Sequence, residues 1–143
     1  GASYLELADV LVQHGARTGR DLEQLFRRIV FSMCISNVDD HLRNHGFLLS
    51  KNGWTLAPAY DMNPVATGDG LTLNVSETDN AQSLELALDV SKYFRVAPQR
   101  ARDIVDDIRR ATRTWRDEAK RHGLSRADQD RMANAFRLAE DPR

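Results

Sequence analysis

Residues 47–56 read Phe47-Leu48-Leu49-Ser50-Lys51-Asn52-Gly53-Trp54-Thr55-Leu56 and predict a β-hairpin in a chain whose other segments mostly have helical periodicity. Two short apolar segments flank Asn52-Gly53, and an Asn-Gly pair in such a setting is a strong signal for a hairpin turn. An antiparallel hairpin brings its two outer ends together. We therefore expect the residues just before Phe47 and just after Leu56 to lie side by side.

Polar residues gather at both outer ends of this hairpin. Upstream, residues 37–44 read Asn-Val-Asp-Asp-His-Leu-Arg-Asn, and downstream Asp61 follows Asn44 by seventeen positions. Asp39 precedes Asn44 by five positions, which is the spacing of the base and the metal-binding amide in the D-x-x-x-x-N loop of protein kinases, whereas Asp40 is one place too late. The pattern predicts Asp39 as a base that faces an acceptor hydroxyl, with Asn44 and Asp61 as metal ligands.

Magnesium is the metal that this set of residues favours, because oxygen ligands from two loops suit an ion that prefers hard donors and keeps several waters. Either Asp39 or Asp40 could instead cap a helix, since Asp is a favoured N-cap. His41 and His45 are four apart, but no Glu follows His41 as in the zinc motif H-E-x-x-H, so we favour histidines that are not zinc ligands. Arg43 either neutralises a nucleotide phosphate, which we favour slightly, or is a solvated loop charge.

Helical periodicity on both sides of this region predicts a mainly α fold. A first helix is expected over residues 4–12, with His14-Gly15 as a stop. A second helix is expected to begin at a capping box of Asp21 with Gln24 and to run into the loop at Asn37.

The second half of the chain is expected to contain an irregular segment and then more helices. Residues 64–80 lack a regular period and are expected to be flexible, although Leu71, Leu73 and Val75 alternate as in a strand. The expected helices are residues 83–90 capped by Ser83, residues 98–123 begun by Pro98, and a last helix opened by a capping box of Ser125 with Asp128.

Composition bounds the class of protein. A chain of 143 residues is about one domain, and its net charge of −1, from 20 basic and 21 acidic side chains, argues against a dedicated nucleic-acid binder. Cys34 is the lone cysteine in an apolar stretch, so a buried thiol in a reducing compartment is expected. Trp54 and Trp115 are expected to be core anchors. We expect no membrane span and no signal peptide, and hence a cytoplasmic protein.

Two strings together resemble one protein family. They are Ser36-Asn37-Val38-Asp39-Asp40-His41-x-x-Asn44 and Pro58-Ala59-Tyr60-Asp61-Met62-Asn63-Pro64. They resemble the C-terminal part of the HipA family of bacterial toxin kinases, near the phosphatidylinositol 3/4-kinase branch of the kinase fold, and the likeness extends over nearly the whole chain. It implies one domain over residues 1–143, mainly α with a β-hairpin (α+β), in the manner of the helical C-lobe of a protein-kinase-like fold.

The resemblance also implies an activity. Asp39 would be the catalytic aspartate, Asn44 and Asp61 would bind Mg²⁺, and the reaction would be transfer of the γ-phosphoryl group of ATP to a protein serine. His41 occupies the place of the histidine in the D-x-H-x-x-N loop of the lipid-kinase branch and could share proton handling with Asp39. The implied setting is a toxin-antitoxin pair, with an aminoacyl-tRNA synthetase as a known kind of target and a DNA-binding antitoxin as partner.

Two features depart from ordinary protein kinases. Asn37-Val38 occupies the place of the His-Arg of those kinases, and Asp61-Met62-Asn63 occupies the place of their Asp-Phe-Gly. No glycine-rich phosphate loop followed by a lysine strand appears, since Gly68-Asp69-Gly70 is too short and follows Asp61. We therefore expect a piece of a longer enzyme, without its N-lobe and inactive or nearly so by itself.

Two other functions fit parts of the pattern. A metal-dependent phosphohydrolase could use Asp39, Asp40, His41 and Asp61 around two metal ions. A non-catalytic module could instead bind an antitoxin or another partner through its helical surface. The kinase interpretation is favoured because it explains the spacing of Asp39, Asn44 and Asp61 at once.

Overall fold

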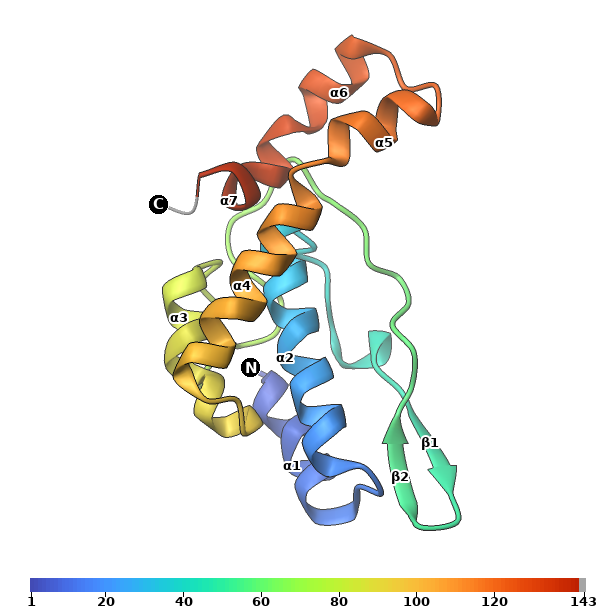
Figure 1. The fold of residues 1–143 in the computed structure, drawn as a ribbon, viewed down its shortest axis with the longest axis vertical. Coiled ribbons are helices and arrows are strands. Elements are labelled where there is room, and N and C mark those ends of the chain that lie inside the picture. Colours follow the sequence, from blue (N-terminus) through green and yellow to red (C-terminus); the bar gives the residue numbers. More distant parts are fainter. Residues whose placement is uncertain (142–143) are drawn as a thin grey trace.

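The computed structural model describes residues 1–141 and confirms the expected α+β class (Figure 1). The helices are α1 (Tyr4–His14), α2 (Thr18–Ile35), α3 (Leu84–Val90), α4 (Pro98–Thr112), α5 (Trp115–Arg121), α6 (Arg126–Met132) and α7 (Arg137–Glu140). Short 3-10 turns are η1 (Leu42–Asn44), η2 (Ser91–Phe94) and η3 (Ala133–Phe136), and the strands are β1 (Phe47–Ser50) and β2 (Gly53–Leu56). Within the described residues, no helix is long and apolar enough to cross a membrane.

Helix α2 is the centre of the fold. It contacts α1, α3, α4 and α7, and Figure 1 shows it running through the middle of the body beside α4. Its apolar stripe recurs at helical spacing and is fully buried, comprising Leu22, Leu25, Phe26, Ile29, Val30 and Met33. Cys34 continues this stripe as a buried free thiol, as expected.

The start of α2 differs from the expectation. The helix begins at Thr18 and not at a cap formed by Asp21. Asp21 is buried inside the first turn, and its Oδ2 accepts a 2.9 Å hydrogen bond from the backbone N–H of Leu56. The capping-box prediction is therefore wrong, because this carboxylate binds the hairpin and not its own helix.

The hairpin itself is confirmed. Phe47 pairs with Leu56 and Ser50 with Gly53 in an antiparallel register. The two loop residues are Lys51 and Asn52, and Gly53 is the first residue of β2. Gly53 has φ 130°, and a Cβ there would lie 2.7 Å from the carbonyl oxygen of His14, so this glycine is required by a close backbone approach.

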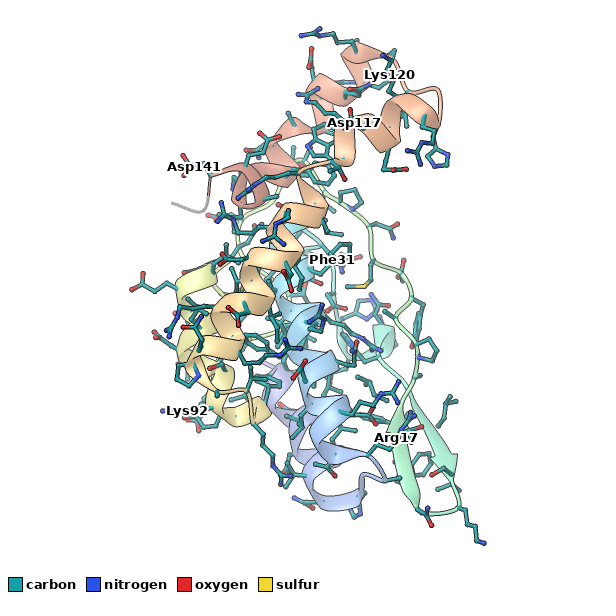
Figure 2. All side chains as sticks on the ribbon, in the orientation of Figure 1. Arg17, Phe31, Lys92, Asp117, Lys120 and Asp141 are labelled. Carbon is teal, nitrogen blue, oxygen red and sulfur yellow. The ribbon has the colours of Figure 1, made fainter. Side chains whose placement is uncertain are left out.

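The hairpin lies against the turn between α1 and α2. The backbone N–H of Ala16 donates a 2.8 Å hydrogen bond to the carbonyl of Trp54, and Arg17 lies beside β2 (Figure 2). Trp54 is 39% exposed, so the expectation that it anchors the core is wrong. It belongs to a two-stranded sheet whose helical neighbours are α1 and α2.

The irregular segment expected to be flexible has defined contacts. Leu71, Leu73 and Val75 are buried, but they do not form a strand. Asn74 is held between the start of the chain and α1, since its carbonyl accepts from the N–H of Tyr4 at 3.0 Å and its N–H donates to the carbonyl of Ala2 at 2.9 Å. The alternation of apolar residues in this segment therefore reflects alternating burial in a loop and not a strand.

The C-terminal half confirms three helix starts and divides two of the expected helices. Ser125 caps α6 through a hydrogen bond from the N–H of Asp128. Ser83 caps α3 through a hydrogen bond from the N–H of Leu86, and Pro98 is in the first turn of α4. The expected helix over residues 98–123 is interrupted between Thr112 and Trp115, and the expected last helix is divided into α6, η3 and α7. Helices α5 and α6 form an arm that projects from the body, with Asp117 and Lys120 on it (Figures 1 and 2).

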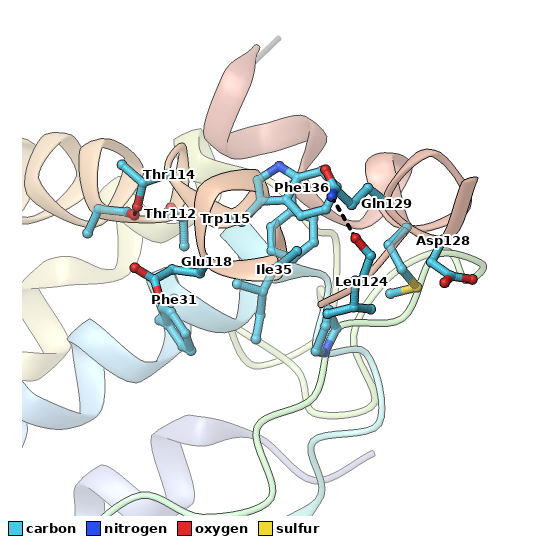
Figure 3. Close-up of a pocket in the computed structure, with 14 residues that line it drawn as sticks. Phe31, Ile35, Thr112, Thr114, Trp115, Glu118, Leu124, Asp128, Gln129 and Phe136 are labelled. Carbon is cyan, nitrogen blue, oxygen red and sulfur yellow. Dashed lines mark hydrogen bonds between the residues drawn. The ribbon is translucent and has the colours of Figure 1, made fainter. Parts of the chain in front are cut away.

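The arm meets the body at a small aromatic cluster. The rings of Trp115 and Phe136 stack at 4.2 Å with 7° between their planes, and they contact Ile35 at the end of α2 (Figure 3). Trp115 is half-buried in this cluster and so anchors the arm more than the main core. A largely apolar cavity of about 360 Å³ lies here, bordered by Phe31, Ile35 and Met132 among others.

Candidate functional site

The loop that follows α2 is fixed at its first residues. Ser36 has φ 53°, a left-handed conformation that ends the helix and turns the chain. Its carbonyl accepts a 3.1 Å hydrogen bond from the N–H of Val65. The carbonyl of Val38 accepts from both the N–H and the hydroxyl of Thr72, at 3.0 and 2.7 Å. These hydrogen bonds hold the backbone of the loop in place up to Val38, just before Asp39.

Asp39 and Asp40 are adjacent in sequence but have opposite environments. Asp39 is exposed and makes no ion pair within residues 1–141. Asp40 is only 2% exposed and accepts hydrogen bonds from the hydroxyl of Tyr4 at 2.6 Å and from Nε2 of His45 at 2.9 Å. Neither aspartate caps η1, whose N-cap is His41 without a side-chain hydrogen bond, so the alternative that one of them is a helix cap is wrong.

Asn44 is buried at the end of the same loop. Its side-chain Nδ2 donates a 3.3 Å hydrogen bond to the backbone carbonyl of Asp39, which ties the two ends of the D-x-x-x-x-N motif together. An amide whose nitrogen is used in this way keeps its oxygen as an acceptor. Asn44 therefore has the oxygen that the predicted metal ligand needs.

His41 and Arg43 lie between these two residues. His41 is half-buried, and its Nδ1 has no hydrogen-bond partner among the described residues. The side chain of Arg43 is exposed, and both residues line one shallow hollow with Thr72. Within residues 1–141, neither side chain has a hydrogen bond that holds it away from this hollow.

The segment that precedes Asp61 meets the loop at the other end of the hairpin. The N–H of Ala57 donates a 2.8 Å hydrogen bond to the carbonyl of Gly46, which continues the strand pairing by one step. Further along, the hydroxyl of Tyr60 donates a 2.8 Å hydrogen bond to the backbone carbonyl of Arg43. The expected meeting of the two segments is therefore present, and it places the residue just before Asp61 against the loop.

The conformation of Asp61 is unusual. It has φ 55°, in the left-handed region that a residue with a side chain rarely adopts, and its carboxylate is exposed. One oxygen, Oδ1, accepts a 2.8 Å hydrogen bond from Nδ2 of Asn63. Strain of this kind is concentrated at functional sites, where the surrounding structure holds it.

Tyr4, Asp40 and His45 form a buried network that the sequence did not reveal. Burial raises the pKa of Tyr4 well above its ordinary value, and the charge of Asp40 and its hydrogen bond raise it further. Arg28 lies nearby and donates to the carbonyl of Ala57; burial lowers its pKa, which the negative charge of Asp40 opposes. Tyr4 is thirty-six positions from Asp40, so no local spacing could have linked them.

A zinc site at His41 and His45 finds no support. Nε2 of His45 is bonded to Asp40, and no group of three or more His, Cys, Asp or Glu side chains in residues 1–141 could hold a metal ion. A magnesium site can use fewer protein side chains than this, here one amide and one carboxylate. Magnesium takes its remaining ligands from water and phosphate.

Comparison with known proteins identifies the family of the chain. A family model described as the HipA-like C-terminal domain matches residues 1–115, which include the loop, the hairpin and Asp61. A protein of Haemophilus influenzae (strain ATCC 51907 / DSM 11121 / KW20 / Rd) that bears the name "Putative kinase" is 38% identical over 60 residues, covering 41% of this chain and 18% of that protein. The match thus spans less than a fifth of that relative's length. The chain belongs to the family of HipA-like C-terminal domains.

Proposed function

We propose that this chain is the catalytic C-terminal part of a protein kinase that transfers the γ-phosphoryl group of ATP to a protein serine. One observation carries the proposal: Asp39 and Asp61 are both exposed, on two segments that the Tyr60–Arg43 hydrogen bond joins. Membership of the HipA-like family and the name of the Haemophilus influenzae relative support it. In such reactions catalysis is almost entirely positioning and neutralisation of charge.

Asp39 is the group proposed to accept the proton of the acceptor hydroxyl. Its carboxylate is exposed, whereas its neighbour Asp40 is buried and bonded, so only Asp39 can reach a protein substrate from this part of the loop. His41, two positions later, has an unpartnered Nδ1 and is proposed to assist in handling this proton. Arg43 is proposed to place its positive charge near the nucleotide phosphates.

The donor atoms of Asn44 and Asp61 fit magnesium. The amide oxygen of Asn44 is left as an acceptor by the hydrogen bond of its nitrogen, and Oδ2 of Asp61 has no hydrogen-bond partner in the described part of the chain. Both are hard oxygen donors of the kind that Mg²⁺ prefers. When bound, Mg²⁺ would neutralise the charge on the ATP phosphates.

A phosphohydrolase is less well supported. It would need Asp40 as a metal ligand, but both oxygens of Asp40 lie 2.9 Å from Nε2 of His45, and Oδ2 also accepts from Tyr4. A purely non-catalytic module would leave the left-handed conformation of Asp61 without a role.

The proposed partners are a protein substrate and a DNA-binding antitoxin. An aminoacyl-tRNA synthetase is the kind of substrate to test first.

The test uses the intact protein that contains this chain, incubated with γ-labelled ATP, Mg²⁺ and candidate acceptor proteins. Asp39→Asn should lower the transfer rate by about 10²–10⁴-fold, the usual contribution of a positioned base. Asp61→Asn removes the charge of a proposed metal ligand, so it should lower the rate and raise the Mg²⁺ requirement. Asp89→Asn changes an exposed acid on α3 and should leave the rate unchanged. Undiminished transfer in both site variants, or hydrolysis of phosphate esters without nucleotide, would overturn the proposal.

A further inference from the structure

We propose that Asp40 is a positioning residue, which together with His45 and Tyr4 forms a buried clamp that holds Asp39 and Asn44 in register. The kinetic consequence rests on the proposed kinase function. The clamp itself rests only on hydrogen bonds and burial, so the two can be tested separately.

The clamp closes the loop at its two ends. Asp40 directly follows Asp39, and His45 directly follows Asn44, so the 2.9 Å bond from Nε2 of His45 to Asp40 fixes the residue next to each functional one. A second hydrogen bond joins the functional residues themselves, since the side chain of Asn44 donates to the backbone carbonyl of Asp39. Asp40 is buried by these bonds, whereas Asp39 beside it is exposed.

Tyr4 connects this closed loop to the helical core. Its hydroxyl donates a 2.6 Å hydrogen bond to Oδ2 of Asp40, and its ring contacts that of His45 edge to face, with 5.8 Å between ring centroids. Tyr4 is fully buried in the first turn of α1 and is bonded through its backbone to Asn74. The loop is therefore anchored to a packed helix and not only to its own backbone.

The carboxylate of Asp40 determines which ring nitrogen of His45 is the hydrogen-bond donor. Carboxylate oxygens can only accept, so Nε2 of His45 carries the proton of the ring. Nδ1 of His45 is buried with no partner in the described residues, so the ring is oriented by the Asp40 bond and the Tyr4 contact alone. The charges of Arg28 and Asp40 also act on each other. Removing Asp40 would take away the carboxylate that accepts from two buried donors, the hydroxyl of Tyr4 and Nε2 of His45.

Two substitutions of His45 separate positioning from packing. His45→Gln keeps an N–H donor for Asp40, whereas His45→Phe keeps the ring shape but has no donor. If the hydrogen bond positions the loop, the Gln variant should be the more active enzyme. If His45 only fills space, the Phe variant should be the more active one, so the order of the two decides the question.

The kinetic experiment uses the intact protein and compares both His45 variants with Asp40→Asn. Loss of such an outer partner of a metal site typically costs about 10–100-fold in metal affinity or activity, so His45→Phe should lower kcat and raise the Mg²⁺ concentration for half-maximal rate by that order. Thr112→Val removes a different buried hydroxyl, which donates to the carbonyl of Ile108, and controls for a general loss of stability. Equal kcat in His45→Phe and the wild type would overturn the proposal.

A second measurement does not depend on activity. In the intact protein labelled with ¹⁵N-histidine, the signals of the His45 ring are those that disappear in His45→Gln. They should report the tautomer with the proton on Nε2, and Asp40→Ala should abolish that preference. A ring with its proton on Nδ1 would overturn the clamp, whereas a clamped ring in a protein that transfers no phosphate would overturn only the kinase function.

Discussion

The hydroxyl of Tyr60 donates a hydrogen bond of 2.8 Å to the backbone carbonyl of Arg43, so the segment before Asp61 is attached directly to the loop that carries Asp39 and Asn44. The attachment is made by a side chain that is 47% exposed and lies outside the core. It therefore influences the site more than it influences the stability of the fold.

Tyr60→Phe tests this attachment. A neutral hydrogen bond contributes about 0.5–1.5 kcal/mol, so in the intact enzyme the transfer rate should fall by up to about tenfold, with little change in unfolding temperature. Tyr93→Phe removes a hydroxyl from a similarly exposed tyrosine in η2 and should leave the rate unchanged. An equal effect of the two substitutions would show that the Arg43 contact has no role.

Asp21→Ala should loosen the hairpin from α2. The buried carboxylate accepts from the N–H of Leu56, and leaving such a donor unsatisfied costs about 1–3 kcal/mol of unfolding free energy. Urea denaturation measures the change. Asp89→Ala makes the same chemical change on an exposed face of α3 and should cost less than about 0.5 kcal/mol.

Ser36 offers a pair of substitutions that separates a hydrogen-bond hub from backbone strain. Its hydroxyl donates to the carbonyl of Ala135 at 2.6 Å and accepts from the side chains of Gln82 and Arg137. Ser36→Ala and Ser36→Gly both remove this hub, but only glycine adopts φ 53° without cost. Ser36→Gly should therefore be the more stable of the two by about 1–2 kcal/mol in urea denaturation. The reverse order would mean that the left-handed conformation is not strained.

Cys34 gives the fold a defined response to alkaline pH. Burial raises the pKa of its thiol from 9.0 to about 11. Because the folded pKa lies above the unfolded one, the stabilisation is complete below about pH 9 and is lost as the pH rises toward about 11. The unfolding free energy of the wild type should fall more steeply than that of Cys34→Ala across this range. Parallel curves would show that the thiol is not desolvated.

The features predicted correctly from sequence depend on neighbours along the chain. Ser83 caps α3 and Pro98 begins α4 because a cap or a fixed φ acts within one turn of its own helix. The buried face of α2 follows from helical spacing alone, and it includes Cys34. The roles of Asp39, Asn44 and Asp61 remain predictions, although the structure leaves each with an atom that could perform its role.

The features predicted wrongly depend on residues distant in sequence. Asp21 has the type and spacing of a cap, but Leu56 competes successfully for its carboxylate. The expected helix over residues 98–123 is interrupted before Trp115, which stacks on Phe136 from the end of the chain. Trp54 is 39% exposed, because its burial depends on how the hairpin packs against α1 and α2 and not on its own segment.

The sequence by itself determined most of the helical segments, the hairpin and the spacing of Asp39, Asn44 and Asp61, because each depends on periodicity or turn chemistry over a few residues. It did not determine where every helix begins and ends. Only the tertiary structure decided which of the two adjacent aspartates is available to a substrate. In the sequence, Asp39 was favoured over Asp40 only by a difference of one residue in spacing. In the structure, Asp40 is unavailable because it is buried and accepts hydrogen bonds from His45 and from Tyr4, which lies in a helix far away in the chain. Such a contact joins distant segments and exists only once the chain has folded.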